Sequence, residues 1–333
     1  MYKKKEKTIL LTAAGGVAMP FIIKHLKNQG YKVFTADIDK YAIGLYLSDK
    51  GFIIPKAANN NFLPTIHKIC QEEKVDIVIP LVDEELLKVI NLEKENIKVL
   101  TPQKTFINSC LDKFKLMKEL NKQKIPIPKT FLLSKSLLNK KINLKYPVII
   151  KPRQGRGSRG IQVINSKKEL KNYINNCNSL NKFIVQTYIQ GEEYTVSVVV
   201  GRNEKIISIV PKKIIHKKGV TKIAITEKNE SIKNICKKIQ QKLKANGPFN
   251  VQLTIDKKSK KPFTFEINPR FSTSTTLTIK SGVDEFSLLI EERFNKKIKP
   301  IKNWKENILL IRENKENFLT QTEFKNKYSK IIR

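Results

Sequence analysis

Several residue types that hold particular classes of protein together are scarce in this 333-residue chain. The four cysteines stand singly with no C-x-x-C pair, which argues against a disulfide framework or a zinc site. The three histidines are too far apart to predict a metal cluster. The sequence has no N-terminal signal pattern and no apolar run of transmembrane length, so we expect a cytoplasmic protein without a membrane-bound part.

Acidic residues are also few, since 30 Asp and Glu stand against 65 Lys and Arg and give a net charge of +35. A charge of this size is compatible with nucleic-acid binding. The lysines are spread along the whole chain, however, and only eight of the basic residues are arginine. Compositional bias explains this mixture at least as well as a binding surface. We therefore expect no specific nucleic-acid recognition, although polyanions should adhere at low salt.

The first 105 residues alternate apolar runs with helical patterns. Strands are predicted at Thr8–Thr12, Tyr31–Asp37, Asp76–Leu81 and Lys98–Thr101. Strands that alternate with helices are typical of a doubly wound parallel sheet, so this part should be a Rossmann-like α/β domain.

Two segments at the ends of these strands could contact a ligand. The turn Ala13–Gly16, with Asp37 further on, has the order of a dinucleotide-binding turn and its ribose-binding acid. The three-glycine spacing is absent, and two glycines need only indicate close backbone packing, so dinucleotide binding is not the favoured interpretation. Pro80–Glu85 could line a ligand site or begin a helix in which Asp83 and Glu84 complement the dipole, and we slightly prefer the helix.

A clearer pattern is the antiparallel hairpin that residues 247–270 predict. Two extended runs, Phe249–Ile255 and Phe263–Asn268, are joined by a lysine-rich turn. Because side chains alternate between the two faces of a strand, Phe265 and Ile267 should both lie on an apolar face. The opposite face should be polar.

The polar face would carry Gln252, Glu266 and Asn268, with Arg270 just beyond the hairpin. Amide and carboxylate oxygens suit Mg²⁺, which combines a few protein oxygens with water and phosphate oxygens. Arg270 supplies a donor fork that matches a phosphoryl group. A half-exposed hairpin with polar outer residues would show the same pattern, so this segment alone leaves both interpretations open.

A glycine-rich loop lies between the predicted strands Pro147–Lys151 and Ile161–Ile164. A dinucleotide-binding turn opens a helix, whereas this loop returns into a strand, as in loops that lay backbone N–H groups over ATP phosphates. Three of the eight arginines fall within residues 153–159, which favours phosphate contact over an ordinary flexible hairpin. The three glycines have the spacing G-x-G-x-x-G: Gly155, Gly157 and Gly160.

Another strand is predicted at Phe183–Ile189, followed by a turn at Gly191–Glu193 and a long strand at Tyr194–Val200. In a nucleotide cleft, backbone groups near Gln186–Ile189 would contact adenine and Glu193 would accept hydrogen bonds from ribose hydroxyls. An exposed loop with paired acids is the alternative.

Together these segments resemble the ATP-grasp superfamily, most of all its carbamoyl-phosphate-synthase type. The matching sequences are VIIKPRQGRGSRGI, FIVQTYIQGEEYTV, NVQLTID and FEINPRFS, in the order of the family. The resemblance covers about residues 105–295 and implies an α/β chain: a doubly wound pre-ATP-grasp domain at 1–105 and an ATP-grasp fold at 106–300, whose α+β subdomains clamp ATP. The lid subdomain would span about 125–190, and residues 301–333 would be a peripheral extension with one strand candidate.

The resemblance also implies roles for individual residues. Lys113 and Lys151 match the phosphate-binding basic residues of the family, and Arg270 matches the arginine that meets the transferred phosphoryl group. Lys151 and Arg270 are therefore the implied catalytic residues. The implied ATP-binding residues are Lys113, Lys151, Arg153, Gly155, Arg156, Gly157, Ser158, Gly160, Gln186, Tyr188, Ile189 and Glu193.

The family's magnesium ligands correspond to Gln252, Glu266 and Asn268. Gln252 is an amide where many relatives have a carboxylate, which resembles the carbamoyl-phosphate-synthase pattern. The implied cofactors are ATP and Mg²⁺, for which Mn²⁺ could substitute.

The activity that the resemblance implies is an ATP-dependent ligation. A substrate carboxylate would attack the γ-phosphate to give an acylphosphate and ADP, and an amine would then displace phosphate to form an amide or peptide-like bond. The partners would be small-molecule carboxylate and amine substrates, and a homodimer is compatible with enzymes of this kind. Two alternatives stay open: an enzyme that phosphorylates bicarbonate or carbamate, and a non-catalytic ATP- or polyanion-binding module. Candidate substrate-contacting segments are Ala13–Met19, Pro80–Glu85, Ile215–Val220 and Ser272–Thr276.

Overall fold

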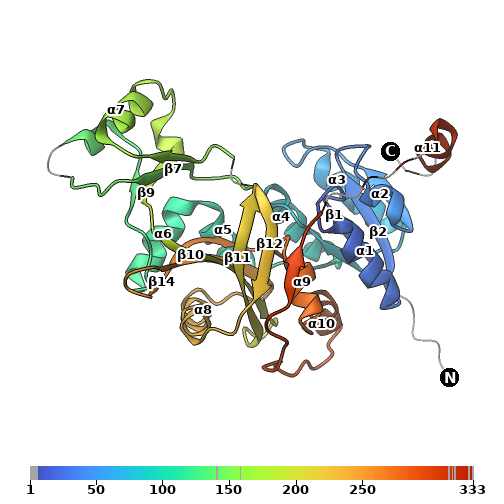
Figure 1. Cartoon of the computed structure of the whole chain (residues 1–333). Helices are drawn as coiled ribbons and strands as arrows, with labels where there is room; N and C mark the ends of the chain where they lie inside the picture. The colour runs from blue at the N-terminus through green and yellow to red at the C-terminus, as the bar shows by residue number, and fades with distance from the viewer. Residues whose placement is uncertain are drawn as a thin grey trace.

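A computed structural model describes residues 7–139, 142–157, 159–313, 316, 318, 320–328 and 331. Its strands form three sheets, and helices pack against each of them (Figure 1). Among the described residues, no helix has the length and apolar character needed to cross a membrane.

The front sheet is parallel, with five strands in the order β3-β2-β1-β4-β5. This order confirms the predicted doubly wound sheet, because helices cover both faces. Ile9 of β1 packs with the first helix, whereas its neighbour Leu10 packs with the third. The strands are β1 (Thr8–Thr12), β2 (Lys32–Asp37), β3 (Lys50–Ile53), β4 (Ile77–Ile79) and β5 (Lys98–Val99).

Strand β3 is absent from the sequence-based prediction. Its four residues, KGFI, include a lysine and a glycine and form no apolar run. The helical elements of this part are α1 (Met19–Asn28), α2 (Gly44–Leu47), α3 (Phe62–Glu72), α4 (Asp83–Val89) and the 3-10 helix η1 (Ile90–Glu95). Helix α4 confirms the preferred reading of Pro80–Glu85, with Asp83, Glu84 and Glu85 in its first turn.

The central sheet is antiparallel, with six strands in the order β14-β13-β10-β11-β12-β15. Alternating residues of its long strands enter different cores: Val198 packs with α8, and Val199 packs with the front helix α1 and with α10. The elements are β10 (Gly191–Val200), β11 (Ile206–Lys218), β12 (Val220–Thr226), α8 (Glu230–Leu243), β13 (Phe249–Asp256), β14 (Pro262–Asn268), α9 (Thr275–Lys280), α10 (Glu285–Arg293) and β15 (Leu309–Ile311).

A smaller sheet of four strands, in the order β6-β9-β7-β8, stands beside the central sheet with α7 on it (Figure 1). Leu170 and Ile174 of α7 pack on Val148 and Ile150 of β7. The elements are β6 (Thr130–Leu132), η2 (Lys135–Leu138), β7 (Val148–Pro152), β8 (Gln162–Ile164), α7 (Lys167–Asn175), η3 (Leu180–Lys182) and β9 (Phe183–Thr187). Helices α5 (Lys104–Leu111) and α6 (Lys113–Lys122) precede it.

Residues beyond 300 contact the rest of the molecule. Strand β15 pairs with β12 and confirms the strand candidate at Ile308–Ile311. Helix α11 (Gln321–Tyr328) lies beside the front sheet (Figure 1), where the Phe324 ring is 6.0 Å from the ring of Tyr41 and 5.8 Å from that of Tyr46. The domain boundaries at 105 and 300 stay predictions.

Candidate active site

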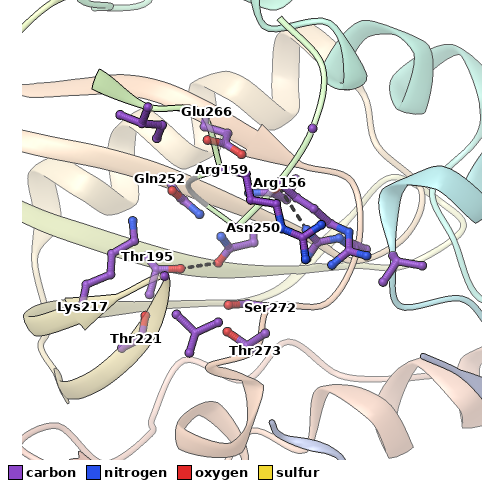
Figure 2. Close-up of a pocket in the computed structure, with 18 of the residues that line it drawn as sticks. Arg156, Arg159, Thr195, Lys217, Thr221, Asn250, Gln252, Glu266, Ser272 and Thr273 are labelled. Carbon is purple, nitrogen blue, oxygen red and sulfur yellow. Dashed lines mark hydrogen bonds between the residues drawn. The ribbon is translucent and has the colours of Figure 1, made fainter. Parts of the chain in front are cut away.

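A cavity of about 930 Å³ is lined by residues of all three sheets. The glycine-rich loop contributes Arg156 and Arg159, which Figure 2 shows beside Gln252, Asn250 and Glu266 of the central sheet. At the other end the cavity reaches the β1–α1 turn of the front sheet. The predicted site residues that line it are Lys113, Lys151, Gly155, Arg156, Gly157, Gln186, Tyr188, Ile189, Glu193, Gln252, Glu266, Asn268 and Arg270.

Two predicted ATP-binding residues, Arg153 and Gly160, do not line the cavity. A third, Ser158, lies outside the described residues. The Arg153 guanidinium is instead ion-paired with Asp112, with 2.5 Å between Nη2 and Oδ2. Asp112 caps α6, because its Oδ1 accepts hydrogen bonds from the backbone N–H groups of Phe114 and Lys115. Arg153 therefore joins the start of the loop to the helix that presents Lys113.

Lys113 is the first residue of α6 and is 7% exposed. Its Nζ donates to the Gly155 carbonyl at 2.7 Å and lies 3.9 Å from Glu266 Oε1. The ammonium group thus lies between the loop and the predicted metal ligand, where a phosphate group would meet both the lysine and a cation. The phosphate-binding role of Lys113 stays a prediction.

Lys151 is at the end of β7 and is 4% exposed. Its Nζ donates to the Phe265 carbonyl at 3.2 Å and lies 5.2 Å from the centre of the Phe265 ring. Burial lowers the pKa of Lys151 to about 8, while the nearby Glu266 carboxylate opposes this shift. An anion placed in the cavity would stabilise the charged form of this lysine.

The loop conformation depends on its glycines. Gly155, Gly157 and Gly160 have φ values of 116°, 70° and 71°, a region that residues with a Cβ rarely adopt. Arg156, between the first two glycines, is ion-paired with Glu84 at the start of α4, with 3.0 Å between Nε and Oε2. The loop therefore reaches from the small sheet to the front sheet.

The far end of the cavity is formed by the strand β9 and the start of β10. The Gln186 side chain is buried and donates to Thr130 Oγ1 at 2.9 Å. The predicted turn at Gly191–Glu193 is wrong, because these residues pair with β13 as the first part of β10. Glu193 is held there by Lys217 of β11, with 2.5 Å between Oε1 and Nζ, so it is fixed at the rim rather than in a free loop.

The hairpin β13–β14 brings the predicted metal ligands together. Gln252 is directly opposite Glu266, and Asn250 is opposite Asn268. Their amide and carboxylate oxygens suit a hard cation such as Mg²⁺. Among the described residues, no three His, Cys, Asp or Glu side chains form a metal-binding group. A cation held here would therefore rely on one carboxylate, on amides and on oxygens of a ligand.

One prediction about this hairpin is wrong. A bulge interrupts the register, because Leu253 pairs with Thr264 while Gln252 pairs with Glu266. The extra residue is Phe265, which lines the cavity instead of joining Ile267 in the core. A bulge inserts one residue and resets the alternation of faces, so simple alternation fails from this point.

Arg270, just after β14, is held by three groups. Its Nε donates to Asp83 Oδ1 at 2.5 Å, its Nη1 to the Phe271 carbonyl at 3.2 Å, and its Nη2 to Asn268 Oδ1 at 3.4 Å. Asp83 belongs to α4, so the front sheet fixes the orientation of this guanidinium. Sequence reasoning missed the contact because the two residues are 187 positions apart.

Further lining residues were also missed by sequence reasoning. Asn250 accepts a hydrogen bond from Thr195 at 2.8 Å, shown in Figure 2, and both lie beside Gln252. The alternation that selected Gln252 would also have selected Asn250, two residues earlier on the same face. Parts of all four candidate substrate-contacting segments line the cavity, with Ser272 and Thr273 at its floor in Figure 2.

Comparison with known proteins agrees with this architecture. Residues 110–274 match the ATP-grasp domain family, and residues 9–102 match the PylC-like, N-terminal domain family. The chain is therefore an ATP-grasp protein with a single ATP-grasp unit behind a PylC-like N-terminal domain, which confirms the resemblance and the fold class predicted from the sequence.

Two curated proteins and two solved structures illustrate the range of relatives. The chain is 24% identical over 285 residues to a carbamoyl-phosphate synthase of Methanobrevibacter smithii, covering 80% of this chain and 75% of that protein. It is 30% identical over 217 residues to a D-alanine–D-alanine ligase of Petrotoga mobilis, covering 63% and 62%.

Among solved structures, the biotin carboxylase domain of Hydrogenobacter thermophilus 2-oxoglutarate carboxylase has a TM-score of 0.74 at 16% identity, covering 92% of this chain and 74% of that one. An L-amino acid ligase of Bacillus licheniformis has a TM-score of 0.68 at 18% identity, covering 90% and 78%. At these identities the structural likeness shows the fold alone.

Proposed function

We propose that this protein is an ATP-dependent, ADP-forming ligase that activates a carboxylate as an acylphosphate and joins it to an amine. The observation that carries this proposal is that Lys113, Lys151, the Gln252–Glu266 pair and Arg270 converge on one cavity. The cavity also extends past them to the front sheet, which leaves room for substrates beside a nucleotide. The relative named as a D-alanine–D-alanine ligase supports this reaction class.

In this proposal ATP lies between the small sheet and the central sheet. Gln186, Tyr188 and Glu193 border the nucleoside, and the glycine-rich loop covers the phosphates. Lys113 and Lys151 neutralise phosphate charge, and the loop excludes water. Glu266, Gln252 and Asn268 would hold Mg²⁺, which would supply positive charge where negative charge develops during transfer.

The substrate carboxylate would lie next to Arg270. A carboxylate oxygen of the substrate attacks the γ-phosphorus of ATP. The bond between the γ-phosphorus and the oxygen that links it to the β-phosphate breaks, and ADP leaves. The Arg270 fork, which Asp83 and Asn268 orient, meets the transferred phosphoryl group. The amine nitrogen then attacks the acyl carbon and phosphate departs, so no covalent bond to the enzyme is needed.

The deciding experiment measures ADP release by the purified protein with MgATP and separate pools of amino acids, other carboxylates, amines and bicarbonate. Hydroxylamine is added in parallel, because it converts an acylphosphate into a stable hydroxamate. ADP release stimulated by one carboxylate pool, with hydroxamate formed, is the expected result. Absence of hydroxamate with every pool would contradict the ligase proposal. Replacement of Mg²⁺ by Mn²⁺ in the same assay tests whether the second cation also supports turnover.

A second candidate is the phosphorylation of bicarbonate or carbamate. It is favoured by the similarity to a protein named carbamoyl-phosphate synthase over 80% of this chain. The neighbouring biotin carboxylase domain was solved with MgADP and bicarbonate, which shows that this fold accommodates that substrate in that protein. ADP release stimulated by bicarbonate alone, without amino acids, would select this reaction over the ligation.

A cytoplasmic location and a homodimer belong to the same proposal. ATP and small carboxylates are available in the cytoplasm, and the biotin carboxylase domain is described as a dimer. Mass measurement in solution, with and without MgATP, tests the oligomeric state.

A further inference from the structure

The front sheet has a topological switch point beside the cavity. Its strand order is β3-β2-β1-β4-β5, so the chain proceeds from β1 toward β2 and β3 on one side and resumes with β4 on the other. In open α/β sheets, ligands bind beyond the carboxyl ends of the two strands that flank such a point. Here those strands are β1, which ends at Thr12, and β4, which is followed by α4.

Glu85 in the first turn of α4 lies at this switch point. It lines the cavity yet is only 5% exposed. Its Oε2 accepts a hydrogen bond from Thr12 Oγ1, and this hydroxyl in turn accepts one from the Leu81 backbone N–H at 3.1 Å. Oε2 is therefore fixed in position, and no described residue donates a hydrogen bond to Oε1.

The charge of Glu85 has little compensation. The pKa of its carboxyl is raised to about 7, mainly by burial and also by the nearby Asp37 and Glu84, whereas Thr12 and Arg156 oppose the shift. Arg156 is ion-paired with Glu84 rather than with Glu85. A buried carboxylate in this position would be stabilised by a cationic group that enters from the cavity.

The other acid at this end of the cavity is already engaged. Asp37 Oδ2 accepts from the Gly15 N–H at 2.8 Å, and Oδ1 accepts from the Asp39 N–H at 2.9 Å. These bonds explain Asp37 as part of the β1–α1 turn. The surrounding wall is apolar, with Met19, Ile22 and Leu81 among the lining residues.

We propose that Glu85 binds the amino group of the amine substrate, an alkylamine or amino acid with an aliphatic body. The inference rests on the proposed ligase function and assigns the position of the second substrate. Arg270, which is paired with Asp83 two residues earlier in α4, lines the same cavity as Glu85. The amine would therefore share this cavity with the acylphosphate.

Glu85 would also take a proton in the reaction. The ammonium form transfers one proton to the Glu85 carboxylate, which leaves a neutral amine with a free electron pair. The nitrogen attacks the acyl carbon, the carbon–oxygen bond to phosphate breaks, and phosphate leaves with that electron pair. A second proton passes from nitrogen to the departing phosphate, so the products are the amide and hydrogen phosphate.

The test compares amines with matched hydroxy compounds. Calorimetric titrations in the presence of MgADP use butylamine, L-alanine and L-leucine as probes, paired with butan-1-ol, L-lactate and L-leucate. For at least one pair, wild-type protein should bind the amine at least about tenfold more tightly, because the hydroxyl leaves the carboxylate without a cationic partner. Glu85→Gln keeps the acceptor for Thr12 but loses the charge, so this preference should fall below about threefold.

Two further measurements separate the possible explanations. Thr12→Val removes the hydrogen bond but keeps the carboxylate, and it should retain the preference for the amine. In wild-type protein, affinity for the amine should rise about tenfold between pH 6 and pH 8, as a carboxyl with a pKa near 7 ionises while the ammonium stays charged. This pH series needs no variant and stands even if Glu85→Gln does not fold.

The site assignment is overturned if wild-type protein shows no preference for any amine, or if folded Glu85→Gln keeps the preference. Hydroxamate formation is read separately. Concentrated hydroxylamine does not need the amine site, so wild-type protein should form hydroxamate without any amine substrate. Its absence in wild type contradicts the ligase function itself, whereas hydroxamate formed by a wild-type protein that shows no preference for any amine overturns the position of the amine site alone.

Discussion

Replacing Arg270 with lysine keeps the positive charge but removes the planar fork. Arg270 now donates from three nitrogens to Asp83, Phe271 and Asn268 over 2.5, 3.2 and 3.4 Å. A lysine has a single nitrogen and would keep the pairing with Asp83 at the expense of the other two contacts. The Arg270 and Asp83 side chains are 12% and 14% exposed, so water would compensate the loss only in part.

The expected magnitudes follow from these contacts. Losing one or two hydrogen bonds from a charged donor should lower the free energy of unfolding by about 1–3 kcal/mol, which leaves the protein folded. Losing a donor aimed at the transferred phosphoryl group should lower turnover by about 10²–10³-fold, or about 2.7–4 kcal/mol of transition-state stabilisation. Thermal unfolding measures the first effect and the rate of hydroxamate formation measures the second.

The comparison with Asp83→Asn makes the reasoning refutable. That variant keeps the fork but weakens its orientation, so its turnover should lie between those of wild type and Arg270→Lys. The two substitutions should also be non-additive in unfolding free energy, because the residues are in direct contact. A folded Arg270→Lys protein with wild-type turnover would show that Arg270 does not meet the phosphoryl group.

Four other perturbations test separate parts of the site and fold. Glu266→Gln should reduce turnover at least about 100-fold while unfolding stays cooperative, since it removes the one carboxylate of the predicted metal site. Unchanged turnover with unchanged dependence on Mg²⁺ would contradict the role of Glu266 as a metal ligand. Above pH 8, ATP affinity should fall by up to about tenfold per pH unit, because Lys151 has a pKa of about 8 and must be protonated to pair with phosphate. Calorimetric titrations from pH 7 to 9 measure this, and an ATP affinity that does not change over this range would exclude the pairing. Gly157→Ala should raise the KM for ATP several-fold, because the φ of Gly157 is 70° and an alanine in this backbone conformation is less stable by about 1–2 kcal/mol. An unchanged KM would mean that the loop closes in another conformation. Lys212→Met should lower the free energy of unfolding by about 3 kcal/mol in a denaturant titration, because the buried Glu285 carboxyl loses the positive charge of Lys212. A free energy of unfolding within about 0.5 kcal/mol of wild type would show that the interaction between Lys212 and Glu285 does not stabilise the fold.

The parts of the site that depend on local pattern could be predicted from the sequence. Alternation along β13 and β14 placed Gln252, Glu266 and Asn268 on one face, and the cross-strand register pairs Gln252 with Glu266. The glycine spacing predicted a loop between strands, and the three glycines have the positive φ that explains their presence. These features are visible in sequence because the residues that cause them are neighbours.

Features that depend on tertiary contacts could not be predicted in this way. The bulge at Phe265 adds one residue to a strand without any marker in the pattern FTFEIN, so the face of Phe265 was assigned wrongly. Strand β3 is a four-residue edge strand whose KGFI sequence gives no apolar run, although Phe52 is buried in the core. The role of Arg153 depends on Asp112, 41 residues earlier, which no local pattern connects to the loop.

The first turn of α4 shows how such distant contacts organise the cavity. Its three successive acids contact three different elements: Asp83 binds Arg270 after β14, Glu84 binds Arg156 in the glycine-rich loop, and Glu85 binds Thr12 at the end of β1. The sequence left two interpretations of this segment open, a ligand contact or a helix start in which Asp83 and Glu84 complement the dipole, and neither distinguishes the individual acids. In the fold they differ, because each contacts a different element of the chain. One turn of α4 thereby holds Arg270, Arg156 of the loop and the Glu85 carboxylate. If the proposed function is correct, a substrate bound at this turn would contact the same helix that orients the groups proposed to bind ATP, which gives a physical reason for the front sheet to accompany the ATP-grasp domain.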